Sequence, residues 1–392
     1  MTLALLPTDE AGVQDAVVSA AAAREPLWVH GNGTKSGMLR RVETARVLST
    51  AGLSGITLYS PSELIISARA GTPIGEVEAA LAEKGQQLTA EPPDLSRIFG
   101  ANGRPQTIGG VTATNLSGPR RVAWGAMRDH VMGIRAVSGR GEVIHSGGRV
   151  LKNVTGLDLC KLFTGSHGTL GVITEVTLKV LPASATSATL VLPGLDAVTG
   201  VAALSAALGS PYGVSGAAWL PKGAGFDGPV GLVRIEDFAA SVAYRTEKLR
   251  AELGIPGAEI LDEASSRTIW KSVRDVLPLP LGDAVWRVSV RPSAGPGVLA
   301  AVAAAGIVGF LDWGGGLVWL SGPASAAAHR QVETATRTAE GTWMLLRGPD
   351  CLRSAVDVVP PEVPALAAIT RRMKASLDPA GVLNPGRLYA GL

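Results

Sequence analysis

The first 180 residues alternate between short apolar runs and polar segments rich in glycine. The apolar runs predict strands over 26–29, 64–70, 131–138, 142–145 and 171–181. Apolar positions three and four residues apart predict helices over 9–24 and from Ile74 to Leu81, the second following Pro73. The segment Gly139-Arg140-Gly141 separates two of the predicted strands, which is typical of a hairpin.

The second half, from about residue 185 to 355, carries the same two patterns. Apolar runs predict strands over 217–220, 285–290 and 317–320, and Ala-rich segments predict helices over 239–253 and 325–340. This order predicts a mixed sheet with helices on one face. Pro182 and the ASATSAT that follows mark the predicted domain boundary. Because nothing repeats with a period of about 20–50 residues, a solenoid is not expected.

Composition narrows the class of protein. The chain has 392 residues, of which 46% are hydrophobic and 18% charged, so it is long and apolar enough for two or three packed domains. A net charge of +3 without a Lys/Arg block gives no support for nucleic-acid binding. The first twenty residues lack the pattern of a signal peptide, and the longest apolar run, 297–311, is shorter than the roughly 18–20 residues that span a bilayer. Cys160 and Cys351 form neither metal spacing nor a disulfide framework, so we expect a cytoplasmic protein.

Three glycine-rich loops are the most informative feature: HGNGTKS at 30–36, TIGGVTATNLSG at 107–118 and GSHGTLGVI at 165–173. Glycine costs about 0.5–1 kcal/mol relative to Ala in an ordered element, so repeated glycine indicates a ligand close to the backbone. The first loop is not a P-loop, because Thr34 separates Gly33 from Lys35. It is not a dinucleotide fingerprint either, because Ser36 stands at the third glycine. Its amides can still form an anion nest. The alternatives are plain turns and packing loops, and His167 is expected to be a lone polar loop residue.

Together these loops resemble the FAD-binding domain of the vanillyl-alcohol oxidase/p-cresol methylhydroxylase (PCMH) superfamily over about residues 5–182. Besides the three loops, the resemblance includes EPPD at 91–94, GPRRVAWG at 118–125, RDHVMGIRAV at 128–137, KNVTGLDL at 152–159 and the continuation TEVTLKVLP to residue 182. The terminal DPAGVLNPGR is similar to the branch that oxidises 2-hydroxy acids. Within that branch, RRVAWGAMRDHVMG and the compact length most resemble the FAD-binding subunits of glycolate oxidase.

The resemblance implies an α+β fold in three parts. Residues 1–182 would form a two-lobed, PCMH-type FAD-binding domain. Residues 185–355 would form a cap domain of antiparallel sheet and helices, for substrate or subunit contact. Residues 356–392 would return to the FAD domain.

The resemblance also implies a set of cofactor contacts. Gly31, Asn32, Gly33, Thr34, Lys35 and Ser36 would hold the FAD pyrophosphate, and Gly109, Gly110, Thr114 and Gly118 would pack along the ADP moiety. Gly165, Gly171 and Ile173 would offer backbone groups, and Asn384 would approach the flavin ring. Members with covalent flavin carry a His in the pyrophosphate loop. Here Thr34 occupies that position and His30 lies too early, so non-covalent FAD is predicted.

The usual catalytic groups of the 2-hydroxy-acid branch are not evident. Its catalytic members hold a divalent metal with paired His and an acidic residue, and use a His as base. This chain has His at 30, 130, 145, 167 and 329, with no such pair, so no metal is predicted and the catalytic residues stay unassigned.

Two functional hypotheses follow. In the first, the chain is an FAD-carrying partner that relays electrons or supports a catalytic paralogue oxidising glycolate to glyoxylate. An iron–sulfur subunit would accept the electrons, because this chain lacks cysteine ligands for a cluster, and any membrane contact would be through the complex. In the second, it is a free-standing 2-hydroxy-acid dehydrogenase whose base is Tyr212, Tyr244 or an Arg/Asp pair. A non-enzymatic scaffold without flavin is a third, which the intact glycine loops disfavour.

Other features have simpler interpretations. Arg120 and Arg121 would either neutralise phosphate or be solvated. Arg371, Arg372 and Lys374 are expected on an exposed helix face. Large aromatic residues in the second half are expected in the core or at a subunit interface, namely Trp286, Trp313, Trp319 and Trp343.

Overall fold

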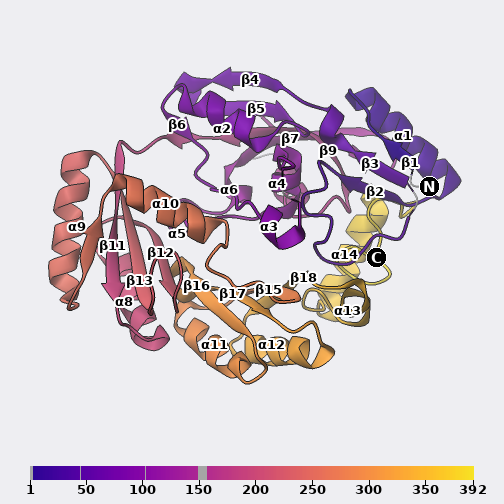
Figure 1. Ribbon diagram of the computed structural model, residues 1–392. Coiled ribbons are helices and arrows are strands. Elements are labelled where there is room, and N and C mark those ends of the chain that lie inside the picture. The colour runs from indigo at the N-terminus through magenta and orange to yellow at the C-terminus, as the bar shows by residue number, and fades with distance from the viewer. Residues whose placement is uncertain (1–2, 45, 102, 149–156) are drawn as a thin grey trace.

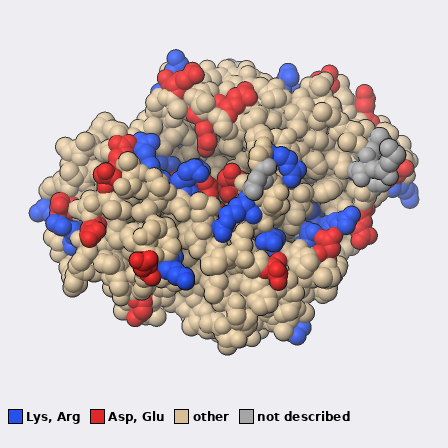
Figure 2. Space-filling model, in the orientation of Figure 1, with Lys and Arg blue, Asp and Glu red and all other residues tan. Residues whose placement is uncertain are grey.

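The computed structural model describes residues 3–44, 46–101, 103–148 and 157–392. Part of the KNVTGLDL segment, residues 152–156, lies outside them. The N-terminal half and the later sheet with its helices form the upper and lower parts of Figure 1, and the C-terminal helices lie beside the first strands. Figure 2 shows Lys and Arg gathered along the band between the two parts, with acidic side chains among them. The predicted α+β fold is confirmed.

The N-terminal half contains two main sheets, which are its two lobes. A three-stranded parallel sheet has the order β1-β3-β2, and helix α1 packs on it. A five-stranded antiparallel sheet has the order β4-β5-β9-β7-β8, and β6 pairs separately with β10. The strands are β1 Leu3–Leu5, β2 Leu27–His30, β3 Arg46–Ser49, β4 Ile56–Ser60, β5 Ile65–Arg69, β6 Gln86–Gln87, β7 Val131–Ser138, β8 Val143–Gly147, β9 Gly171–Lys179 and β10 Leu181–Pro182. The helices are α1 Glu10–Ala23, α2 Ile74–Ala82, α3 Ser96–Phe99, α4 Ile108–Thr114, α5 Arg121–Trp124, α6 Met127–His130 and α7 Leu159–Phe163.

The cap is an eight-stranded sheet of order β14-β11-β13-β12-β16-β17-β15-β18 with its helices. Every strand pairing in it is antiparallel, so the mixed sheet predicted from the pattern is wrong. The strands are β11 Thr186–Pro193, β12 Val214–Leu220, β13 Val230–Asp237, β14 Glu259–Leu261, β15 Ala284–Ser289, β16 Val308–Asp312, β17 Leu317–Gly322 and β18 Thr342–Arg347. The helices are α8 Ala197–Gly209, α9 Ala239–Leu253, α10 Glu263–Arg274, α11 Gly295–Ala303 and α12 Ala326–Thr338.

The ASATSAT segment is not a linker, because it runs into strand β11. This strand pairs with β13 along all eight of its residues. Thr and Val are good strand formers, and the Ser/Thr-rich start concealed the strand. We propose the division into residues 1–182, 185–355 and 356–392 as domains, with the boundary falling just before β11.

TIGGVTATNLSG is also not a loop throughout, because its central residues form helix α4. Thr107 caps this helix, since its Oγ1 accepts a hydrogen bond from the Gly110 amide at 3.3 Å. Gly109 packs so closely that an added Cβ would lie 2.6 Å from the Cβ of Ala70. Close packing against Ala70, which directly follows β5, therefore explains why residue 109 is a glycine.

Helix α13 Asp350–Ala355 ends the cap, and the C-terminal segment, with α14 Pro364–Leu377, ends against strand β2. The Leu27 amide donates to the Val382 carbonyl at 2.7 Å, and the Asn384 amide donates back to Leu27 at 3.1 Å. Lys374 is buried, and its ammonium donates to Asp378, so its predicted exposure is wrong. Among the described residues, no helix has both the length and the hydropathy needed to cross a bilayer.

A buried ion network joins the N-terminal half to the cap. The Arg234 guanidinium on β13 donates to both carboxylate oxygens of Glu91, at 3.0 and 3.1 Å, and Arg120 donates to both oxygens of Glu236, at 3.1 and 2.6 Å. Burial opposes ionisation of Glu91, but Arg234 and Arg120 more than offset it and lower its pKa. Arg120 is therefore neither a phosphate ligand nor solvated.

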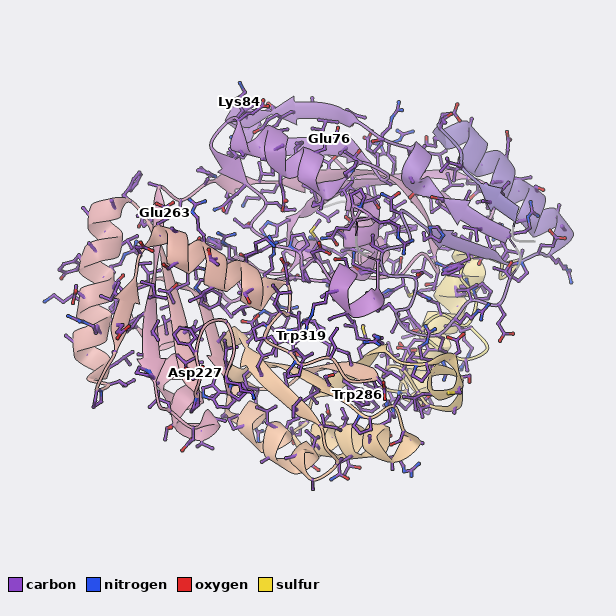
Figure 3. The ribbon with its side chains drawn as sticks, viewed as in Figure 1. Glu76, Lys84, Asp227, Glu263, Trp286 and Trp319 are labelled. Atoms are coloured by element: carbon purple, nitrogen blue, oxygen red, sulfur yellow. The ribbon has the colours of Figure 1, made fainter. Side chains whose placement is uncertain are left out.

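Trp286, Trp313, Trp319 and Trp343 are all buried in the cap. Trp286 faces helix α12, where its Nε1 donates to His329 Nδ1 at 3.1 Å, and Trp319 points away from it, on the side of the N-terminal half (Figure 3). The core interpretation is confirmed. Residues so deeply buried cannot form an apolar interface with another subunit.

Candidate functional site

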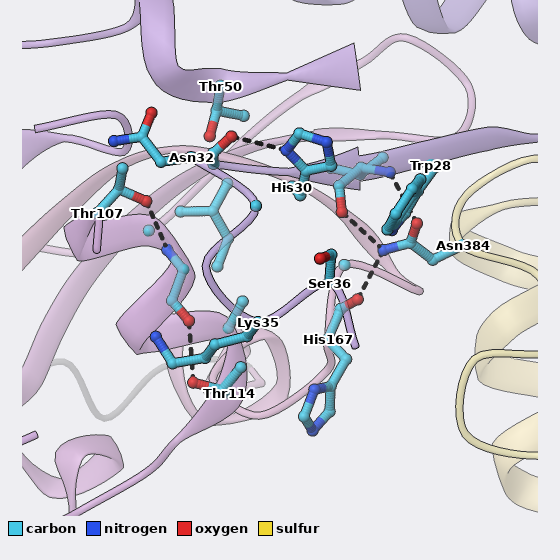
Figure 4. Close-up of a pocket in the computed structure, with 18 of the residues that line it drawn as sticks. Trp28, His30, Asn32, Lys35, Ser36, Thr50, Thr107, Thr114, His167 and Asn384 are labelled. Carbon is cyan, nitrogen blue, oxygen red and sulfur yellow. Dashed lines mark hydrogen bonds between the residues drawn. The ribbon is translucent and has the colours of Figure 1, made fainter. Parts of the chain in front are cut away.

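A cavity that is open to solvent lies where β2, the following loop, α4, the 165–171 loop and the C-terminal tail meet (Figure 4). Nearly all the predicted cofactor residues line it. They are Gly31, Asn32, Gly33, Thr34, Lys35, Ser36, Gly109, Gly110, Thr114, Gly171, Ile173 and Asn384. Segments more than 350 positions apart in sequence thus meet around one space.

The loop at 31–36 provides backbone donors to this cavity. Gly33 has φ +67°, a conformation that favours glycine, and a Cβ on Gly31 would lie 2.2 Å from Thr107 Oγ1. Among the described residues, the amides of Asn32, Gly33, Thr34 and Lys35 find no hydrogen-bond acceptor. Successive amides without acceptors form a nest that suits an anion.

The cavity is also positively charged. Lys35 donates from Nζ to Gln106 Oε1 at 2.7 Å, and burial lowers its pKa to about 8, although Asp94 acts in the opposite direction. The Arg387 guanidinium donates to the carbonyls of Lys35 at 3.2 Å and Arg40 at 2.8 Å, and burial lowers its pKa to about 9. No Asp or Glu is among the described residues that line the cavity. An anionic ligand would offset these charges.

Asn384 connects three segments at the cavity wall. Its Oδ1 accepts from the Val29 amide at 2.7 Å, and its Nδ2 donates to the carbonyls of Val29 at 3.1 Å and His167 at 2.8 Å (Figure 4). Because this one side chain connects strand β2, the 165–171 loop and the C-terminal tail, it holds the walls of the cavity in place. The NPGR tail was the sequence signal for Asn384, and Arg387 in the same motif went unrecognised.

His167 lies in a loop, as expected, and that loop is part of the cavity wall. Its backbone has φ +53°, and its amide donates to the Ala113 carbonyl at 2.9 Å. Burial, and then the charge of Arg387, lower the pKa of its imidazole to about 3. At neutral pH the ring is therefore uncharged and can accept one hydrogen bond while donating another.

Gly118 and Gly165 lie outside the lining of the cavity. An added Cβ on Gly118 would lie 2.2 Å from the Glu91 carbonyl oxygen, and the Gly118 carbonyl accepts from Trp313 Nε1 at 3.0 Å. Gly165 has φ +89°, and its amide donates to Thr112. Packing and turn geometry explain both glycines. The lining residues that were not among the predicted cofactor contacts, apart from His167, are Trp28, Val29, His30, Thr50, Thr107, Ala113, Gly168 and Arg387.

Comparison with known proteins identifies the family of this chain. Residues 1–147 match the model of a family described as an FAD binding domain. The chain is 34% identical over 382 residues to glycolate oxidase subunit GlcE of Escherichia coli, covering 96% of each chain. The chain belongs to the GlcE family. As a member of this family it is an FAD-dependent oxidoreductase.

Shorter matches connect this GlcE-family chain with other flavoenzymes. It is 33% identical over 168 residues to glycolate oxidase subunit GlcD of Bacillus subtilis, covering 43% of this chain and 34% of that one. It is 31% identical over 169 residues to a D-lactate dehydrogenase of Archaeoglobus fulgidus, covering 43% and 36%. The fold matches 4-ethylphenol oxidase from Gulosibacter chungangensis with a TM-score of 0.70, at 14% identity and covering 99% and 89%.

The cavity fits FAD by the chemistry of its donors. The amides without acceptors and the charges of Lys35 and Arg387 suit a pyrophosphate, and the cavity runs from them to Asn384 and His167. Among the described residues, no group of three His, Cys, Asp or Glu is placed to hold a metal ion. The site therefore offers anion binding and uncharged polar contacts.

Lys35 should make FAD affinity depend on pH. Because the pKa of Lys35 is about 8 without ligand and a phosphate favours the ammonium form, binding should take up a proton. We expect affinity to fall by up to about tenfold per pH unit above about pH 8. Titration of the flavin-free protein with FAD, followed by flavin fluorescence, measures this slope. In Lys35→Met the slope should disappear, and an unchanged slope would exclude Lys35 as its source.

Proposed function

We propose that this chain is the FAD-binding subunit of a complex that oxidises glycolate, or a similar 2-hydroxy acid, to the 2-oxo acid. The observation that carries the proposal is the cavity, in which acceptor-free amides, two buried cations and glycine-lined walls converge. The relatives' names as glycolate oxidase subunits support the choice of substrate.

Each part of the cavity has a role in this proposal. FAD, when bound, supplies a redox group that can relay the electrons that the catalytic paralogue takes from the substrate. The amides of the 31–36 loop and Lys35 bind the pyrophosphate, while Gly110 and Thr114 lie along the ADP moiety. Asn384 and His167 lie at the flavin end, where the uncharged imidazole hydrogen-bonds without adding charge.

The chain's role beside a catalytic paralogue and an iron–sulfur subunit is part of the proposal. A free-standing dehydrogenase needs its own base, and the two tyrosines considered for it do not line the cavity. Tyr212 instead donates to Glu252, which raises its pKa to about 12, and Tyr244 is exposed. These positions favour the supporting role. A cytoplasmic location, with membrane contact through partners alone, stays a prediction.

Anaerobic mixing with glycolate tests the proposal. We expect the isolated, flavin-loaded chain to keep its flavin absorbance, and the chain assembled with its paralogue and iron–sulfur subunit to turn over glycolate. Rapid bleaching of the isolated chain would contradict the supporting role and favour the free-standing dehydrogenase. A purified chain without flavin, in a complex that oxidises glycolate normally, would contradict the proposed function.

We predict that the FAD is held without a covalent bond. Thr34, in the pyrophosphate loop, has no atom that could attach to the flavin ring, and His30 turns its Nδ1 toward the Gly31 carbonyl at 2.7 Å. Acid precipitation should therefore leave the yellow colour in the supernatant. Flavin that remains in the washed pellet would show that the link is covalent, and a His30→Ala variant would then identify its site.

A further inference from the structure

Two arginines from different parts of the chain stack on one tryptophan between the N-terminal half and the cap. The Arg121 guanidinium carbon, from α5, lies 4.5 Å from the centroid of the Trp313 ring. The Arg287 guanidinium carbon, from β15, lies 5.0 Å from the same centroid. Trp313 is itself fixed, because its Nε1 donates to the Gly118 carbonyl four residues after α4.

Strand alternation directs Arg287 toward the N-terminal half. Its neighbour Trp286 faces α12, so Arg287 lies on the opposite face of the sheet. Arg287 is directly paired with Trp319, which Figure 3 shows on the side away from Trp286. The guanidinium therefore lies at the boundary between the cap and the N-terminal half, where Arg121 approaches from the other side.

Neither guanidinium has a carboxylate partner among the described residues. Neither forms an ion pair or a side-chain hydrogen bond there, although Arg287 is half-buried and burial, with the charge of Arg121, lowers its pKa to about 10. Asp129 lies near Arg121, but its carboxylate accepts from the Ala126 amide at 2.8 Å. Asp312 lies near Arg287, but its carboxyl accepts from the Trp313 amide at 2.7 Å, and burial raises its pKa to about 7.

Asp129 and Asp312 offset part of the charge of the two arginines. Neither guanidinium is paired with them directly, so the N–H groups of both arginines are left to solvent. A carboxylate accepts paired hydrogen bonds from a guanidinium and would offset both charges. The Trp313 ring adds a flat apolar wall suited to a short carbon chain. These properties favour an anionic ligand over an uncharged one.

We propose that Arg121 and Arg287, on either side of the domain boundary at Trp313, form a binding site for the carboxylate of a small organic acid. The choice of a carboxylate rests on the proposed function, whose substrate and product both carry one. The site would let this subunit itself bind substrate or product, and the arginines would be binding residues.

Oxalate, a small unreactive dicarboxylate, is the probe. We expect isothermal titration of the flavin-loaded chain to detect oxalate binding, and Arg121→Gln and Arg287→Gln to weaken it by about 10- to 100-fold each. Arg291→Gln is the matched control, because Arg291 lies just beyond β15 and pairs with Glu340 at the surface, so this variant should bind as wild type.

The thermal midpoint of unfolding, measured without ligand, distinguishes a role of the two arginines in binding from a role in stabilising the fold. Removing one of two repelling cations should leave it unchanged or raise it, whereas loss of a structural stacking contact would lower it. The proposal is overturned if wild type does not bind oxalate, or if both arginine variants bind it like Arg291→Gln. Flavin content and glycolate turnover of the assembled complex, measured on the same samples, test the proposed function separately.

Discussion

Gly33→Asp should purify almost free of flavin. The new carboxylate would lie in the loop whose acceptor-free amides are proposed to hold the pyrophosphate. Two unit charges about 4 Å apart, at an effective dielectric constant of about 20, interact by about 4 kcal/mol, so we expect FAD affinity to fall by about 100- to 1,000-fold. The ratio of flavin to protein absorbance, and a titration of flavin-free protein with FAD, measure the loss.

Gly33→Asn is the matched control for this change. Residue 33 has φ +67°, and both Asp and Asn tolerate that conformation better than other side chains. The nearest atom to an added Cβ is Arg104 Nη1 at 3.3 Å, so both variants meet the same small steric cost. Asn should therefore retain most of the flavin. Equal loss of flavin in both variants would indicate that the added side chain, and not its charge, prevents binding. A full content of flavin in Gly33→Asp would refute the assignment of the 31–36 loop to the pyrophosphate.

Arg234→Met should cause the largest loss of stability. Arg234 and Glu91 are both almost fully buried and joined by two hydrogen bonds, so removing the cation leaves Glu91 without its bidentate partner at the domain boundary. Breaking such a buried pair costs about 3–5 kcal/mol in the free energy of unfolding. Urea unfolding followed by tryptophan fluorescence measures this loss.

The control for Arg234 is an exposed ion pair of the same type. Arg267 pairs with Glu263 on the surface of α10, with 66% and 42% of the side chains exposed, so Arg267→Met should change the free energy of unfolding by less than about 0.5 kcal/mol. Equal effects of the two variants would contradict the role assigned to the network.

The network also predicts that the free energy of unfolding decreases at acid pH. Burial of Glu236 is outweighed by Arg234 and by the hydrogen bond from Arg120, so its pKa falls to about 2 from an ordinary value of 4.5. A lowered carboxyl pKa stabilises the folded state above about pH 4.5, and this contribution is lost as the pH falls toward 2. Arg234→Met should flatten this part of the curve of stability against pH.

The sequence predicted much of the site because glycines and short polar residues occur there in three ordered motifs. It predicted the helix over 239–253 and the hairpin of β7 and β8, where the pattern is strong and local. It failed for α4, whose glycines disguise a capped helix, and for β11, whose Ser and Thr conceal a strand. Both errors arose because close packing against other segments, not local propensity, fixes those residues.

By itself, then, the sequence determined the fold class, the cofactor family and most of the residues around the cavity. Only the tertiary structure decided which polar residues face ligand and which face each other. Arg120 and Arg121 are adjacent in sequence, yet Arg120 belongs to a buried ion network, whereas Arg121 stacks on Trp313. The reason is that the free energy of a charged side chain depends on its burial and on partners far away in the chain. The residues next to it in sequence determine neither of these.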